Sequence, residues 1–347
     1  MRTRLTTCIL MVLFIVITHC NNDSPNQTES PKGVFVEKIA FTNWDLSLPA
    51  PLIMIADLYN DNGIFRLYNR TELTEGCHPT FSRDKSLIAY IDPVNGTTAM
   101  IIHADGTLKR EIPFPDSIVV ENNSLSPDGQ KLVFDYHNLN RDYGILGVGT
   151  ISIDGSNFKS VHYEYGWSFL PCWSADGSQI YFSWLDMDNR FGHNLPNTSR
   201  KKSYIVKMNP DGSGFQVVSD TISGISHDRY PAVSPDGTQI AFTSQRNHPD
   251  RIVSEIFVMN IDGTNVRQLS FIEPDDKRVG GQYERCIFHN NPIWTTDGQY
   301  ILFNQDITIY HADINDYEDL QDIYIVSVNG GEAQNITNND FNSLTKH

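Results

Sequence analysis

Cysteine is scarce in this sequence. Only 5 cysteines occur in 347 residues, and Cys8 and Cys20 both lie close to the N-terminus. The remaining three, Cys77, Cys172 and Cys286, are too far apart in sequence to form a CxxC-type metal site, and they allow at most one disulfide. The fold must therefore be held together by a packed core rather than by a disulfide framework.

Positive charge is also in short supply. The chain has 26 Lys and Arg residues against 42 Asp and Glu residues, which gives a formal net charge of −16. The acidic residues are spread through the sequence rather than gathered in one tail. A nucleic-acid-binding protein needs a basic face, so this function class is excluded.

Familiar catalytic and metal-binding motifs are missing as well. The sequence has no GxSxG nucleophile elbow, no HExxH and no phosphate-binding loop. The acidic stretch from Asp313 to Asp322 lacks the spacing and the glycine of an EF-hand, so we expect a solvated loop there rather than a calcium site. We expect no metal and no cofactor.

Only one hydrophobic run stands out, and it lies at the N-terminus. Arg2 and Arg4 precede an apolar run over 8–17, as in an export signal. Cys20 follows in a segment that resembles a bacterial lipobox, with His19 where a small residue is usual. We expect residues 1–19 to be a lipoprotein signal cleaved before a lipidated Cys20, and residues 20–33 to be a flexible polar tether. A plain secretory signal and an uncleaved anchor are the alternatives, and all three place residues 34–347 outside the cytoplasm.

The rest of the chain is organised around a repeat. Tyr230 to Thr243 reads as two short strands joined by a tight turn at Ser234-Pro-Asp-Gly237. Similar segments recur about every 40 to 60 residues, and each is followed by a second pair of apolar runs around an Asp-Gly or Asn-Gly turn. The hydroxyl residues of the five copies are Ser82, Ser126, Ser174, Ser234 and Thr295, and an Asp always follows two places later. Four strands per unit, repeated, predict a radial array of small sheets.

This repeat resembles that of the TolB-type β-propellers, over nearly all of residues 34–347. The resemblance implies an all-β fold, a six-bladed β-propeller of four-stranded antiparallel blades, with residues 34–76 as a degenerate first repeat. We expect the N-terminal strand to close the ring by joining the sheet of the last blade. Propellers of this type serve as scaffolds, partner-binding modules, accessory domains of peptidases and occasional lyases, so the resemblance alone does not fix a function. TolB itself carries an additional α/β domain ahead of its propeller, whereas residues 21–33 alone separate Cys20 from the first strand that we expect here.

The two faces of such a propeller would differ. The Pro-Asp-Gly and Asp-Gly turns share one face and are short, whereas the long connectors share the other. Insertions on one face of a repeat scaffold are typical of its binding face. Eight of the eleven histidines fall on the long-connector face: His78, His137, His162, His193, His227, His248, His289 and His311. Long loops also collect polar residues without any function, and no HxH or HxxxH spacing favours a metal.

Polar residues just before each inner strand should surround the mouth of the central channel. They are His78, Asn122, Asp228, Arg229, His289 and Asn291. Hydrogen bonding between blades is the alternative role for them. We therefore predict a non-enzymatic binding or scaffolding module of the bacterial cell envelope. It would be monomeric, anchored through Cys20 to the outer membrane, in the periplasm or at the cell surface, and would recognise a protein or a glycan. The rival prediction is a lyase-like, metal-dependent enzyme acting on polysaccharide, in which His78 and His289 help to bind a divalent metal and Arg229 holds a carboxylate.

Overall fold

The computed structural model describes residues 30–43, 49–93, 96–107, 109–140, 146–163, 167–186, 202–219, 227–247, 253–272, 278–279, 282–283, 285–311 and 316–337. These residues form strands and turns and contain no helix, so the all-β prediction is confirmed. No helix among them is long and apolar enough to cross a membrane. The predicted signal peptide, Cys20 and nearly all of the tether lie outside the described residues.

Consecutive strands pair antiparallel in groups that follow the sequence repeat. The groups are β1 (Val34–Asn43), β2 (Leu52–Asp61) and β3 (Ile64–Glu75); β4 (Cys77–Phe81), β5 (Leu87–Ile91), β6 (Thr98–His103) and β7 (Lys109–Pro113); β8 (Ile118–Leu125), β9 (Lys131–Asn138), β10 (Leu146–Ser152) and β11 (Lys159–His162); β12 (Trp167–Trp173), β13 (Ile180–Leu185), β14 (Ser203–Met208) and β15 (Gln216–Val217); β16 (Arg229–Val233), β17 (Gln239–Ser244), β18 (Val253–Asn260) and β19 (Arg267–Gln268); and β22 (Arg285–Trp294), β23 (Tyr300–His311), β24 (Asp316–Ser327) and β25 (Gln334–Asn335). We call these six antiparallel groups, in chain order, the first to the sixth sheet. A separate two-stranded ribbon joins β20 (Arg278–Val279) and β21 (Gln282–Tyr283).

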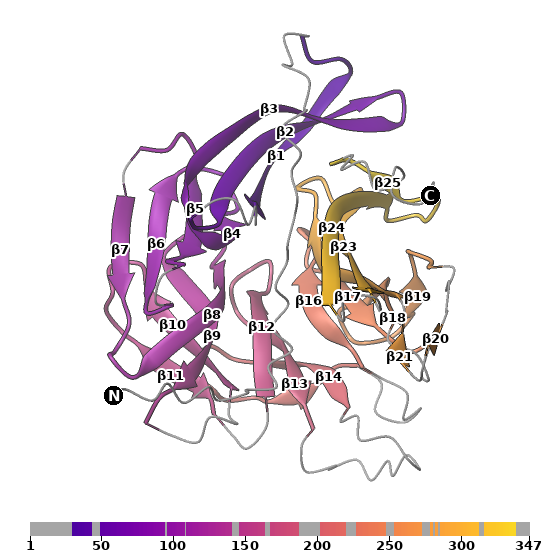
Figure 1. The fold of residues 1–347 in the computed structure, drawn as a ribbon. Helices are drawn as coiled ribbons and strands as arrows, with labels where there is room; N and C mark the ends of the chain where they lie inside the picture. Colours follow the sequence, from indigo (N-terminus) through magenta and orange to yellow (C-terminus); the bar gives the residue numbers. More distant parts are fainter. Residues whose placement is uncertain are drawn as a thin grey trace, which may run out of the picture.

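The six sheets follow one another in chain order around a common centre (Figure 1). Short parallel pairings, β10 with β12 and β18 with β22, link neighbouring groups into two longer sheets. The first strands β4, β8, β12, β16 and β22 contact one another in succession, so they line the centre. We call them the inner strands.

Each pair of neighbouring sheets encloses its own buried apolar cluster. Between the second and third sheets, for example, Ile101 and Ile112 pack with Leu132 and Phe134. Equivalent clusters lie between the other consecutive sheets. Burial of apolar area is the main favourable contribution to folding, so the core is spread around the ring rather than gathered in one place.

The turns between the first and second strands explain the recurring Asp. In Ser234-Pro-Asp-Gly237, Ser234 Oγ donates to Asp236 Oδ1 at 2.6 Å and accepts from the backbone N–H of Gln239 at 2.9 Å. Gly237 has a φ of 75°, which a side chain would disfavour. The same hydroxyl–carboxylate bond is present at Ser82, Ser126, Ser174 and Thr295. These aspartates are turn formers, as their repetition indicates.

The two ends of the array meet differently from our expectation. The N-terminal strand β1 pairs with β2 in the first sheet, while the sixth sheet is completed by its own β25, so the prediction of an N-terminal strand in the last sheet is wrong. The two sheets instead pack face to face, with Ile39 and Leu58 against Leu302 and Ile325. Side-chain packing and a few hydrogen bonds therefore join the ends of the array.

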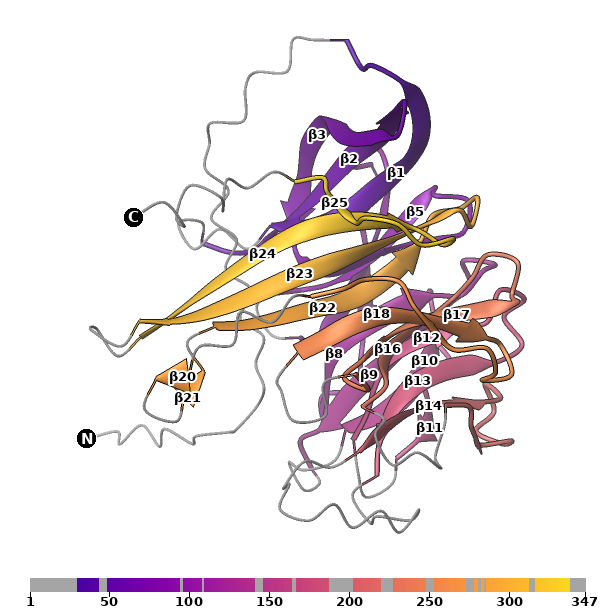
Figure 2. The ribbon, with the colours of Figure 1, turned by 90° about the vertical axis from the view of Figure 1, so that its right-hand side faces the viewer.

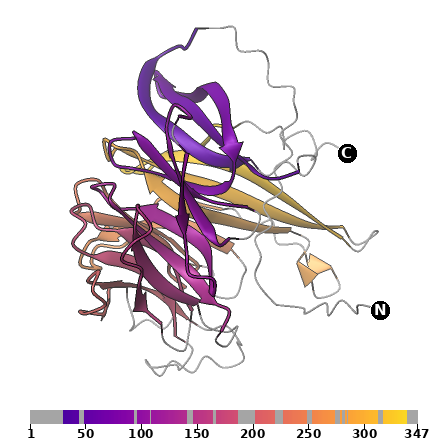
Figure 3. The same ribbon diagram turned by 90° about the vertical axis from the view of Figure 1, so that its left-hand side faces the viewer.

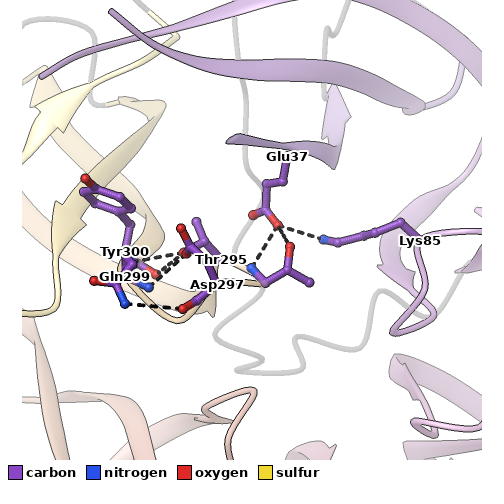
Figure 4. Close-up of polar contacts among 7 residues, drawn as sticks. Glu37, Lys85, Thr295, Asp297, Gln299 and Tyr300 are labelled. Atoms are coloured by element: carbon purple, nitrogen blue, oxygen red, sulfur yellow. Dashed lines mark hydrogen bonds and ion pairs between the residues drawn. The ribbon is translucent and has the colours of Figure 1, made fainter. Parts of the chain in front are cut away.

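A buried carboxylate supports this junction. Glu37, in β1, accepts hydrogen bonds from the backbone N–H and Oγ1 of Thr296 at 3.1 and 2.7 Å (Figure 4). Lys85 Nζ, from the second sheet, lies 3.4 Å from the same oxygen. One side chain thus bridges the sixth, first and second sheets.

The connector between the second and third strands of the sixth sheet also differs from the prediction. Instead of a loop over 305–321, β23 and β24 continue their pairing out to His311 and Asp316. Figures 2 and 3 show this hairpin reaching past the surrounding sheets. The acidic residues from Asp316 to Asp322 therefore lie on a strand and not in a solvated loop.

Candidate functional site

Four of the five inner strands share a kink towards the end of the ring that carries the long connectors. β4, β12, β16 and β22 each contain a shift of register, and there His78, Leu170, Tyr230 and Asn291 have φ of 52–56° directly before a proline. This left-handed conformation is unfavourable for residues with a side chain. Hydrogen bonds to the preceding sheet hold this conformation in place. The backbone N–H of His78 donates to Thr42 Oγ1, and the backbone N–H of Tyr230 donates to Ser183 Oγ. We call this end of the ring the connector face and the opposite end the turn face.

One buried carboxylate organises the connector face. Asp135, in β9, is fully buried and accepts from the backbone N–H groups of Asn122 and Leu170 at 2.8 and 2.7 Å, as well as from the Asn122 side chain. Burial, and next the Glu121 charge, raise the pKa of Asp135 to about 7. The sequence-predicted Asn122 is thus tied to a carboxylate that we did not predict.

Glu121 and His137 form a hydrogen bond next to this carboxylate. Nε2 of His137 lies 2.8 Å from Glu121 Oε1, and both side chains are partly exposed. Nδ1 of His137 is buried and has no hydrogen-bond partner among the described residues. The side chain of His78 is exposed. Desolvation by the surrounding protein lowers the pKa of its imidazole, and the charge of the Glu121 carboxylate opposes this shift.

Arg229 and Tyr230 lie on the other side of the ring, on β16. Nε of Arg229 donates to Ser203 Oγ at 3.1 Å, and the guanidinium lies over the ring of Phe169. Burial raises the pKa of Tyr230, and the charges of Asp306, Arg229 and Asp135 all act on its hydroxyl. Charged groups of the third, fifth and sixth sheets therefore act on one region.

Two of the predicted residues are engaged inside the protein. Asp228 is fully buried and accepts from Nη2 of Arg246 at 3.0 and 2.9 Å. Burial raises its pKa, and the Arg246 charge opposes this. His289 is buried, with Nδ1 2.7 Å from Ser270 Oγ and Nε2 3.0 Å from Gln305 Oε1, and burial lowers its pKa to about 4. With both ring nitrogens in hydrogen bonds, His289 has no lone pair directed at a metal.

The six predicted residues therefore divide into two groups. His78, Asn122, Arg229 and Asn291 are exposed or partly exposed at the connector face, whereas Asp228 and His289 are not. No three His, Cys, Asp or Glu side chains are grouped as a metal would require in the part of the chain that the structure describes. The sequence did carry a signal for Asp135, because it is the acidic residue at a position of the repeat that is uncharged in the other copies. The corresponding positions of the other second strands are Ile91, Ser183, Thr243 and Asn304.

The turn face is covered by the molecule itself. Arg83, in the turn after β4, donates from Nη1 to Ala175 O at 2.8 Å and from Nη2 to Pro235 O at 3.3 Å. These carbonyls belong to the turns of the fourth and fifth sheets, so the side chain crosses the centre of the ring. Neighbouring turns also lie close together, since a Cβ atom at Gly177 would touch Pro127.

Comparisons with known proteins support the fold. The chain is similar to the structure of a putative TolB from Agrobacterium tumefaciens, with 17% identity and a TM-score of 0.55, over 78% of this chain and 83% of that one. It is similar to TolB from Acinetobacter baumannii, with 15% identity and a TM-score of 0.58, over 87% of this chain and 66% of that one. An oligogalacturonate lyase from Vibrio parahaemolyticus matches with 13% identity and a TM-score of 0.46, over 86% of this chain and 99% of that one.

No protein-family model matches the sequence, and no curated protein matches it closely enough to count as a relative. At these identities the structural likeness shows the fold and nothing more. The protein has an all-β fold with β-propeller neighbours.

Proposed function

We propose that the protein is an exported binding module, a six-bladed propeller that recognises a partner at its connector face. Four-stranded antiparallel groups in five of the six sheets support the blade count, as do buried clusters between consecutive sheets and between the sixth and the first. The first blade is the exception, with three described strands. TolB-like neighbours are consistent with a binding module.

The difference between the two faces is the observation that carries the proposal. Arg83 and the packed turns cover the centre of the turn face. The connector face instead presents exposed His78 and Asn291 together with partly exposed Glu121 and Arg229. A partner can therefore reach polar groups near the centre of the ring from the connector face.

The charges favour a protein partner with basic residues over an acidic glycan. Glu121 and Asp306 place negative charge near the centre of this face, and Arg229 adds a positive charge there. Concave surfaces of one sign concentrate ligands of the opposite sign. The overall charge of −16 acts in the same direction.

Export and anchoring rest on the sequence. Residues 1–19 act as the signal, and lipid on Cys20 holds a monomeric propeller at the outer membrane, in the periplasm or at the cell surface. Incorporation of labelled palmitate in a bacterial host tests the anchor. Label should be lost in Cys20→Ala and retained in Cys8→Ala; label in both would contradict the assignment.

Site-specific photocrosslinking tests the binding face. Benzoylphenylalanine is placed at His78 or Asn291 on the connector face, and at Arg83 as the turn-face control. We expect discrete adducts from His78 and Asn291 that are sensitive to protease, because the partner is a protein. Adducts from Arg83 alone, or equally from both faces, would contradict the proposal, and protease-resistant adducts cleaved by glycosidases would replace the protein partner with a glycan.

A further inference from the structure

Among the described residues, the first sheet has no strand at the position that lines the centre in the other five sheets. The sequence Lys38-Ile-Ala-Phe-Thr42 in β1 matches Gln239-Ile-Ala-Phe-Thr243 in β17, which is a second strand. Thr42 Oγ1 accepts from the kinked N–H of His78, as Ser183 Oγ of the second strand β13 accepts from Tyr230. β1 is thus a second strand, and β2 is its single partner among the described strands. Its other edge faces the place where an inner strand would lie.

The chain leaves the sixth sheet next to β3, at the outer edge of the first sheet, and the open edge of β1 lies on the other side of β2. In the other sheets, the outermost strand is followed by the inner strand of the next sheet, as β7 is followed by β8. β25 is the outermost strand of the sixth sheet, and the next sheet around the ring is the first. Gln334 Nε2 donates to Gly63 O, and Arg70 Nη2 donates to Thr337 O, so this end of the chain is fastened to β3.

The residues after Thr337 carry the sequence of an inner strand. Asn342-Ser343-Leu344-Thr345 repeats Asn123-Ser124-Leu125-Ser126 from β8 with a single Thr-for-Ser difference. All five inner strands end with an apolar residue before a hydroxyl residue, as Leu344 precedes Thr345.

We propose that the open edge of β1 is a strand-binding site and that residues 338–347 of the same chain occupy it. The added strand supplies the innermost strand of the first blade and closes the ring through backbone hydrogen bonds. This inference goes beyond the proposed function and holds whether or not the connector face binds a partner.

The repeat fixes the register of the added strand. Ala232, two residues before its hydroxyl residue, pairs with Ala241, and Val233 pairs with Ile240. Because Ile39-Ala40 corresponds to Ile240-Ala241, Ser343 should lie opposite Ala40 and Leu344 opposite Ile39. Directly opposed residues of antiparallel strands have Cα atoms about 4.5 to 5.5 Å apart, within the range of about 4.4 to 6.8 Å that a disulfide spans.

Engineered cysteines test this register in the full-length chain. We expect Ala40→Cys with Ser343→Cys to form an intramolecular disulfide under mild oxidation, detected by mass spectrometry of peptides digested without reduction. The control pairs Ser343→Cys with Phe35→Cys, which is half exposed on the same strand about 16 Å away from Ala40. Equal yields from both pairs, no crosslink, or only crosslinks between two copies would overturn the proposal, the last by making a second copy the occupant.

Truncation provides an independent measurement. A chain ending at Thr337 should lose about 5 °C or more in thermal midpoint, with faster hydrogen exchange along β1. A synthetic peptide of residues 338–347 should restore both, whereas a scrambled peptide should not. Unchanged exchange along β1 after truncation would overturn the proposal, and so would equal rescue by the scrambled peptide.

Discussion

Glu37 and Thr296 are 259 residues apart in sequence, yet the Glu37 carboxylate accepts hydrogen bonds from both the backbone N–H and the hydroxyl of Thr296. The first and sixth sheets meet at this contact, and Lys85 brings in the second. A carboxylate that is almost fully buried is stable only where donors surround it. The junction therefore depends on a polar contact as well as on apolar packing.

Replacing Glu37 by Ala should weaken this junction. Two hydrogen bonds to a charged acceptor are lost, and we expect the free energy of unfolding to fall by about 1 to 3 kcal/mol. Urea denaturation measures the change. Lys85→Ala removes only a partly exposed ion pair and is the matched control, with an expected loss below about 1 kcal/mol. An effect of Glu37→Ala no larger than that of Lys85→Ala would contradict the role of the contact.

Asp135 should make stability depend on pH. Its pKa is raised to about 7 in the folded protein, above the ordinary value of 3.8, so the folded state binds more protons between these values. The free energy of unfolding should therefore decrease as the pH rises from about 4 to about 7, by about 1.4 kcal/mol for each unit of pKa difference.

Asp135→Asn should flatten this part of the pH profile, since it removes the titrating group, although one backbone N–H then faces the amide nitrogen. Chemical denaturation at several pH values measures the slope, and ¹³C NMR follows the carboxyl group directly. Asp105→Asn, in an exposed turn, is the control. A midpoint for Asp135 below pH 4, or an unchanged slope in Asp135→Asn, would contradict the burial argument.

The turn aspartates should act in the opposite direction. The hydrogen bond from Ser174, followed by those from the backbone and side chain of Ser178, lowers the pKa of Asp176 to about 2. The stabilisation is present above the ordinary pKa of 3.8 and is lost as the pH falls towards 2. We expect Asp176→Ala to cost about 1 kcal/mol at pH 7 and nothing at pH 2, as measured by urea unfolding. An equal cost at both pH values would show that the carboxylate charge is not involved.

Chelation should leave the protein unchanged. His289 uses both ring nitrogens in hydrogen bonds to Ser270 and Gln305, so it cannot join His78 in binding a metal. We expect the same thermal midpoint with and without EDTA, and no stoichiometric metal by elemental analysis of purified protein. One bound divalent metal per chain that is lost in His78→Ala would instead support the polysaccharide-processing alternative.

Local turn chemistry made the fold predictable, whereas the site depended on contacts between sheets. The Ser-Pro-Asp-Gly turns at Ser126 and Ser234 repeat the same bonds, so their strands could be placed without a structure. Asp228 directly precedes β16 and His289 lies within β22, and sequence position alone could not show that Arg246 and Gln305 lie close enough to form hydrogen bonds with them. Glu37 was missed because its partner is in the last repeat. The acidic run ending at Asp322 was read as a loop because its charge obscured the pairing of β23 with β24.

The central claim is that the acidic connector face binds a partner, and a charge reversal tests it most directly. The yield of the adduct from benzoylphenylalanine at His78 is measured in Glu121→Lys and compared with Glu111→Lys, an exposed position on the outer strand β7. We predict that Glu121→Lys reduces the adduct at least about tenfold, which corresponds to about 1.4 kcal/mol, and that Glu111→Lys leaves it unchanged. An undiminished adduct in Glu121→Lys, in protein that is folded and exported, would contradict the account.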